Sequence, residues 1–125
     1  MKINEIIEYV DNIKPNHYSQ EMKVSWLSDL DSMIKKEIID THEGAEKVNF
    51  EKYTVQTPLT TKLLVEEPYS TIYRFYLEAQ IDLANGEIDK YNNSVILYNN
   101  ELEKFKNYHN RNNMPLQTNI KFYRG

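Results

Sequence analysis

Apolar residues recur between Pro68 and Arg111 at alternating steps of four and three, the spacing that places side chains on one face of a helix. This stripe consists of Leu77, Ile81, Ala84, Ile88, Tyr91, Val95, Tyr98, Leu102 and Phe105. The residues between these positions are mainly asparagines and charged residues, so the stripe is narrow on a long solvated body. It needs a partner helix, from the same chain or from another.

The Asn85-Gly86 pair leaves two architectures open for this region. The pair is typical of a turn, which would fold two helices into a helical hairpin, yet the apolar spacing passes through it without a change of phase. A single helix would extend about 60 Å at 1.5 Å per residue, which a small domain could cover only by oligomerising. We favour the hairpin, and both alternatives require extensive pairing of helices.

Two further helices are predicted before this region. Apolar residues at helical spacing run from Lys2 to Ile13, and Pro15 then ends the first helix. Ser19 is well placed as the N-cap of the second helix. We expect one broad apolar face of that helix to form the heart of the core, formed by Met22, Trp26, Leu27, Leu30, Met33, Ile34 and Ile38. The opposite, polar face is expected to carry Lys23, Asp29, Asp31, Lys35 and Lys36.

Gly44 is expected to stop the second helix, because glycine just past a helix takes the left-handed conformation readily. Residues 45–67 then change to β-branched and aromatic residues, which predicts an extended insert or a β-hairpin. A lone hairpin is marginal in water, so the insert must pack against the helices or another subunit. Pro68 suits the first turn of a third helix.

The last helix should end near Asn110 to Asn113, because asparagines and then Pro115 follow it. We therefore expect one mainly α-helical domain over residues 1–113, a small bundle of about four helices with the insert between helices 2 and 3. Residues 114–125 form an extended C-terminal tail in this scheme. Phe122 and Tyr123 make the tail a candidate for docking on its own or a neighbouring subunit.

Composition narrows the classes of function. The 125 residues carry a net charge of -4, so the chain lacks the excess of Lys and Arg on which tight nucleic-acid binding relies. The absence of cysteine removes disulfides, thiolate nucleophiles and thiolate metal sites. No signal peptide or membrane-spanning run is evident, and we expect a soluble, intracellular protein.

Motifs for catalysis or cofactor binding are weak. His17, His42 and His109 lie in separate segments without metal-site spacing. His42-Glu43 beside Asp40 is the best local cluster for acid-base or metal chemistry, but a helix terminus explains it as well. With three glycines the chain has no phosphate-binding loop. We expect no catalytic site, metal or cofactor.

The tyrosines and phenylalanines of residues 69–108 could form a platform for stacking bases, but few Lys and Arg accompany them. Packing in the core and at interfaces is the better interpretation of this aromatic series.

Several short motifs resemble small structural proteins of tailed phages and prophages of Gram-positive bacteria. They are Ile38-Ile39-Asp40-Thr41-His42-Glu43-Gly44 after a Trp-containing helix, Pro68-Tyr69, Tyr76-Leu77-Glu78-Ala79-Gln80-Ile81-Asp82, Asn85-Gly86-Glu87 and Tyr91-Asn92-Asn93-Ser94. The resemblance covers Ile3 to Arg111 and is closest to head-tail connector (adaptor, head-completion) proteins. None of these motifs is catalytic.

This resemblance implies a helical virion structural protein that assembles as a ring, with twelvefold symmetry as the expectation, beneath the portal protein in the phage neck. A neck or tail-completion protein would attach next, and DNA would pass without being specifically bound. The subunit would occupy the host cytoplasm during virion assembly. Candidate assembly-interface residues are Leu63, Leu64, Val65, Phe122 and Tyr123. The alternatives are a small helical regulatory or protein-binding module of phage origin and, with least support, a small enzyme.

Overall fold

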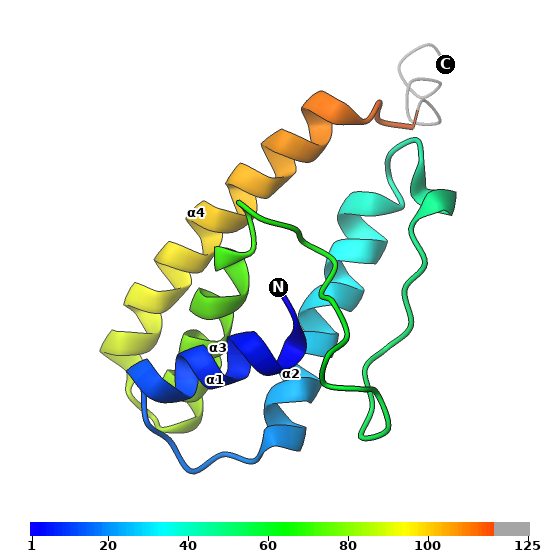
Figure 1. Ribbon diagram of the computed structural model, residues 1–125. Coiled ribbons are helices and arrows are strands. Elements are labelled where there is room, and N and C mark those ends of the chain that lie inside the picture. Colours follow the sequence, from blue (N-terminus) through cyan, green and yellow to red (C-terminus); the bar gives the residue numbers. More distant parts are fainter. Residues whose placement is uncertain (117–125) are drawn as a thin grey trace.

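The computed structural model describes residues 1–116, which form a bundle of four α-helices without a β-strand (Figure 1). The helices are α1 (Ile3–Ile13), α2 (Gln20–Ile34), α3 (Thr71–Ala84) and α4 (Ile88–Asn112). A π-helical turn, η1 (Lys35–Ile39), continues α2, and a 3-10 turn, η2 (Ala45–Lys47), follows it. The mainly helical fold predicted from the sequence is confirmed.

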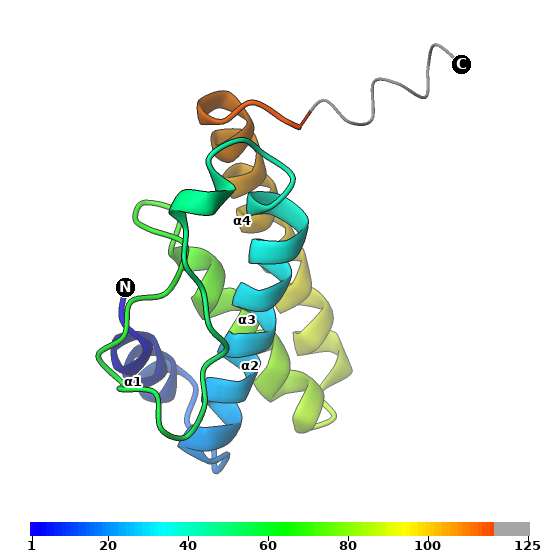
Figure 2. The same cartoon turned by 90° about the vertical axis from the view of Figure 1, so that its right-hand side faces the viewer.

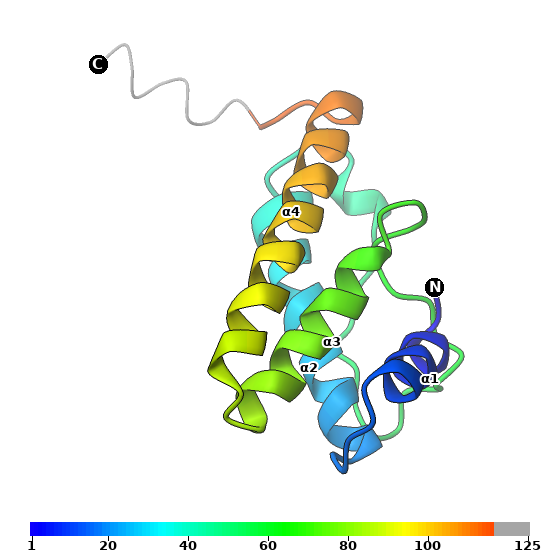
Figure 3. The same ribbon diagram turned by 90° about the vertical axis from the view of Figure 1, so that its left-hand side faces the viewer.

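Helix α3 lies at the centre of the bundle. It contacts α1, α2 and α4, and Figures 2 and 3 show α2, α3 and α4 side by side with α1 crossing near one end. In contrast, α4 buries only two side chains, Ser94 and Phe105, and is the outermost helix. The hydrophobic core accordingly comes mainly from the first three helices, with Ile3, Ile6, Val10, Leu27, Leu30, Ile34, Ile72, Tyr73, Leu77 and Ile81 almost fully buried.

The Asn85-Gly86 pair forms the turn of a helical hairpin between α3 and α4. Gly86 has a φ of 74°, which is in the left-handed region that favours glycine, and its N–H bonds to Leu83 O at 3.0 Å. The single long helix is therefore not formed. Because the chain reverses here, the stripe positions Ala84 and Ile88 are exposed, whereas Leu77 and Ile81 in α3 are fully buried.

The expected faces of α2 need correction, although the N-cap is confirmed. Ser19 Oγ accepts a hydrogen bond from Met22 N at 3.1 Å. Met22 itself is exposed and Trp26 is half-buried, packed edge-to-face on Tyr18 at 5.9 Å between ring centroids. Lys23 and Asp31, which the helical spacing predicts on the polar face, are both buried. Each buried charge has polar partners, which offsets its loss of hydration.

The insert is irregular and does not form the β-hairpin that the sequence allowed, within the described residues. One isolated antiparallel bridge joins Lys62 to Lys2. The backbone carbonyls of Thr61 and Leu59 accept hydrogen bonds from Ile3 N and Asn4 N at 3.0 and 2.9 Å. The first amides of a helix have no partner within it, so the insert satisfies the N-terminus of α1.

The start of α3 and the end of α2 also differ from expectation. Pro68 lies in a turn, and the α-helix begins three residues later at Thr71, because the amides of Ile72 and Tyr73 bond only three residues back. Gly44 is left-handed at φ 89°, but the helical segment already ends at Ile39. Thr41 Oγ bonds the carbonyl of Ile38 at 2.8 Å and so caps that end.

Helix α4 ends at Asn112, as predicted, and the chain then pairs with the turn after η1. Glu43 N donates to Met114 O at 2.7 Å, and Leu116 N donates to Thr41 O at 2.9 Å. These two bonds surround an antiparallel bridge between His42 and Pro115. Phe122, Tyr123 and the rest of residues 117–125 lie outside the described residues.

Candidate functional site

A groove at one end of the bundle is the best candidate for a binding site. It lies between α1, the first turns of α2 and the segment Tyr53–Leu59, and it consists of two adjoining hollows of about 440 and 270 Å³. The two hollows share Gln20 and Leu59. We call it the α1–α2 groove, lined by Asn4, Ile7, Glu8, Asp11, Asn12, Gln20, Glu21, Val24, Ser25, Tyr53, Thr54, Val55, Thr57 and Leu59.

The α1–α2 groove combines an apolar floor with an acidic rim. Its lining contains three carboxylates and, among the described residues, no Lys or Arg. Asp11 is paired with the buried Lys23 at 2.7 Å, whereas Glu8 and Glu21 are exposed and make no ion pair with the described residues. A concave surface lined by one sign of charge concentrates its field, so the groove suits a segment that carries cations beside apolar side chains.

Buried Asp31 holds one wall of the groove in place. Its carboxylate, which is fully buried on α2, accepts hydrogen bonds from Tyr53 OH at 2.6 Å, Tyr73 OH at 2.7 Å and Leu64 N at 3.1 Å. Ser28 Oγ accepts a further bond from Tyr53 N at 3.0 Å. Asp31 therefore fastens the insert, including Tyr53 in the groove wall, to α2 and α3.

The pKa shifts of Asp31, Tyr53 and Tyr73 favour a structural role for this cluster. Burial raises the pKa of Asp31, although the hydrogen bonds from Tyr53 and Tyr73 act in the opposite direction. Burial, followed by the nearby Asp31 charge, raises the pKa of both tyrosines. The tyrosine protons are therefore held in hydrogen bonds to Asp31 and are poorly suited to acid-base exchange.

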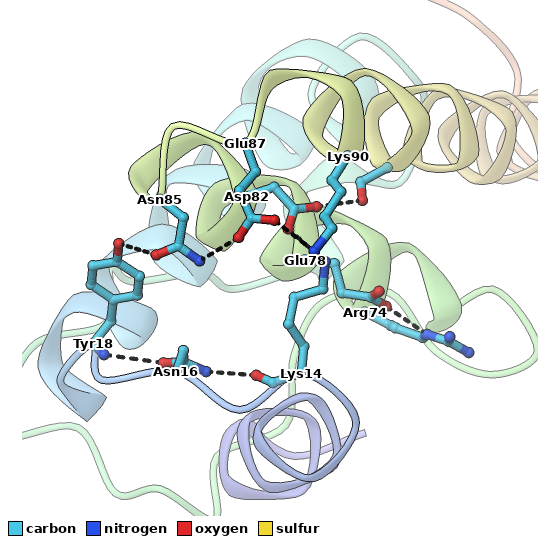
Figure 4. A network of polar contacts seen from close by, with 10 residues as sticks. Lys14, Asn16, Tyr18, Arg74, Glu78, Asp82, Asn85, Glu87 and Lys90 are labelled. Carbon is cyan, nitrogen blue, oxygen red and sulfur yellow. Dashed lines mark hydrogen bonds and ion pairs between the residues drawn. The ribbon is translucent and has the colours of Figure 1, made fainter.

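A second polar network fixes the connection between α1 and α2 to the hairpin turn (Figure 4). Lys14 Nζ donates to Asp82 Oδ1 at 2.5 Å, and Ser94 Oγ donates to Asp82 Oδ2 at 2.9 Å. Tyr18 OH donates to Asn85 Oδ1 at 2.6 Å. Because Lys14 and Tyr18 lie in the connection between the two helices that border the groove, this network fixes their relative position.

The structure brings two of the three histidines together at the other end of the bundle. His42 and His109 pack edge-to-face with ring centroids 4.7 Å apart. His42 Nδ1 lies 2.6 Å from Ile38 O, and its Nε2 lies 2.5 Å from Asn110 Oδ1. His109 Nε2 is buried without a hydrogen-bond partner in the described part of the chain. Burial, and then His42, lower the pKa of His109, which favours its neutral imidazole. The pair joins the turn after η1 to α4.

The other candidates from the sequence do not gather into a site. His17 is exposed, Asp40 pairs with Lys35, and Glu43 engages the tail through its backbone. None of these residues, and neither histidine of the pair, lines the α1–α2 groove.

The proposed interface residues have different environments. Leu63 and Val65 are buried in the core of the subunit, whereas Leu64 is half-buried. Phe122 and Tyr123 fall outside the described residues. Of the proposed interface residues within residues 1–116, Leu64 is the most exposed.

Sequence reasoning missed Lys23 and Asp31, although a signal was available. Lys23 lies four residues before Leu27, and Asp31 lies four after it, so both share the face of this core leucine. A charge on an apolar stripe indicates a buried, paired group. The groove itself had no local signal, because it joins residues that are distant in sequence.

Residues 1–116 form neither a cluster of metal ligands nor a membrane-spanning helix. No group of three or more His, Cys, Asp or Glu side chains is arranged to hold a metal ion there. None of the described helices combines the length and the hydropathy that crossing a membrane requires.

Comparison with known proteins adds no relative. No protein family, no curated protein and no solved structure matches this chain.

Proposed function

We propose that the protein is a virion structural protein of a tailed phage or prophage, a head-tail connector subunit without enzymatic activity. The motifs described above support this, because they resemble connector proteins along most of the helical region. One structural observation carries the proposal: the subunit has unlike surfaces on different parts of the bundle. The α1–α2 groove is acidic, whereas α4 exposes Ile96 and Leu97 to 58 and 45%.

Unlike surfaces are what a ring requires. In a ring each subunit contacts its neighbours through two different patches, whereas a two-fold dimer uses the same patch twice. Large apolar side chains exposed on α4 are unfavourable in water, and their burial against a partner such as the portal would stabilise the complex. The net charge of -4 is also suited to a channel through which DNA slides without being held.

The proposal is tested by mixing the protein with the portal protein of the same phage and imaging the complex by electron microscopy. The expected result is a ring stacked on the portal, with twelvefold symmetry. Ile96→Asp should weaken stacking on the portal because it places a charge in the apolar α4 surface. Asn107→Asp, on the same helix and also exposed, is the matched control. No complex with portal or with DNA-filled heads would contradict the proposal.

A second candidate, a small regulatory or protein-binding module, is favoured by the α1–α2 groove, which could bind a basic segment of another protein. This function predicts a monomer or a dimer of fixed size in complex with one partner. The same portal experiment separates the two functions, because a module would give neither a ring nor higher assemblies as its concentration rises.

A further inference from the structure

We infer that the α1–α2 groove of one subunit binds residues 117–125 of a second copy, so that subunits join head to tail. The inference rests on the proposed connector function and deepens it, because it names the contact that would join neighbours in the ring. It combines three observations: the chemistry of the groove, the composition of the segment, and the place where the described chain ends.

The segment and the groove are complementary in charge and polarity. Residues 117–125 contain three large apolar side chains, Ile120, Phe122 and Tyr123, alternating with the cations Lys121 and Arg124, and no acidic residue. The groove provides an apolar floor and a rim of Glu8 and Glu21, neither of which makes an ion pair within residues 1–116. Its two hollows, of about 440 and 270 Å³, are large enough for aromatic side chains.

The end of the described chain lies too far from the middle of the groove for Phe122 to reach it within one subunit. Leu116 N is bonded to Thr41 O, just past η1. Figures 1 and 2 show the end of α4 at the end of the bundle away from the start of α2. Gln20, at the middle of the groove, begins α2, and the 15 residues of α2 with the five of η1 separate it from Thr41. At 1.5 Å per residue this separation is about 30 Å.

A fully extended chain from Leu116 to Phe122 spans about 21 Å at most, at 3.3 to 3.6 Å per residue. Phe122 therefore falls short of Gln20 in its own subunit, even along a straight path. A neighbouring subunit has no such limit, since its groove can lie directly beside the chain end. The groove and Leu116, after which the segment follows in the chain, lie at opposite ends of the subunit. Each subunit therefore offers one groove and one segment, and repetition closes into a ring or continues as a filament.

The inference is tested by mixing two matched variants of the protein. Glu8→Lys with Glu21→Lys reverses the groove but keeps the segment, and a chain ending at Leu116 keeps the groove but lacks the segment. Both glutamates are exposed and unpaired among the described residues, so the reversal should leave the fold intact. Each variant alone should be monomeric in sedimentation velocity. Their mixture should form a 1:1 heterodimer and nothing larger, because only one groove and one segment remain.

Restoration by charge exchange provides a sharper control. Lys121→Glu with Arg124→Glu, placed in the chain that carries Glu8→Lys and Glu21→Lys, should restore the assembly of the natural chain. Reversal of the groove alone should weaken association by roughly tenfold or more, because attractive contacts become repulsive. Phe122→Ser with Tyr123→Ser should also abolish assembly, whereas Asn119→Ser should leave it unchanged.

A mixture that remains monomeric, or that grows beyond 1:1, overturns the inference, as does normal assembly of the chain that ends at Leu116. Titrating a peptide of residues 114–125 into that truncated chain checks the contact directly, and no binding at millimolar peptide would also overturn it. Portal binding is measured separately. If the truncated protein binds the portal but does not self-associate, the connector function remains supported. If the two variants form heterodimers but do not bind the portal, the groove contact remains supported and the connector function is wrong.

Discussion

Asp31 is the residue on which attachment of the insert depends. Replacing it with alanine leaves the hydroxyls of Tyr53 and Tyr73 and the amide of Leu64 without their acceptor inside the protein. We expect Asp31→Ala to lower the free energy of unfolding by about 3 to 5 kcal/mol, as measured by urea denaturation. Asp29→Ala, an exposed position on the same helix, should change it by less than about 0.5 kcal/mol. Equal effects of the two substitutions would contradict this role.

His109 gives the protein a pH-dependent stability. Burial, with His42 beside it, lowers the pKa of His109 below the value of about 6.5 that it has in the unfolded chain. Below about pH 6.5 the unfolded state therefore binds more protons than the native state. The stability that neutral His109 contributes is fully present above this pH and is lost as the pH falls. We expect the urea midpoint to fall between pH 7.5 and 5.5, and His109→Gln to reduce that fall. The exposed His17→Gln should keep the natural pH dependence, and an unchanged dependence in His109→Gln would refute the prediction.

At the scale of elements, the turn between α3 and α4 decides whether two helices or one long helix forms. Gly86 has a φ of 74°, and an added Cβ would meet nothing within 4 Å, so the cost of a substitution is purely one of backbone conformation. We expect Gly86→Ala to destabilise the protein by about 1 to 2 kcal/mol in thermal unfolding. Gly86→Asn should cost less, since asparagine tolerates the left-handed region better. The opposite order would mean that the turn does not have this conformation.

The elements also show which signals are local. The N-cap at Ser19, the turn at Asn85-Gly86 and the end of the last helix were all predictable, because capping, turn chemistry and helical spacing act within a few residues. The start of α3 was misplaced at Pro68. A proline suits a first helical turn, but it suits the preceding turn equally, and tertiary contacts decide between them.

For the whole molecule, the end of α4 is held by a short pairing with the turn after η1. A chain ending at Asn113 loses the bonds of Met114 to Glu43 and of Leu116 to Thr41. We expect it to be less stable by about 1 to 2 kcal/mol, because a backbone hydrogen bond contributes about 0.5 to 1.5 kcal/mol. A chain ending at Leu116 should match the full chain in thermal unfolding at low protein concentration. Equal stability of both truncated chains would show that the pairing contributes nothing.

By itself the sequence determined the helical class, the hairpin turn and most helix boundaries, since these follow from propensity and spacing along the chain. Only the tertiary structure decided that Lys23 and Asp31 are buried while Met22 is exposed. It also decided that His42 meets His109 across the bundle and that an irregular insert completes the α1–α2 groove. These contacts join residues far apart in sequence, and their free energy depends on packing and desolvation, which local patterns do not encode.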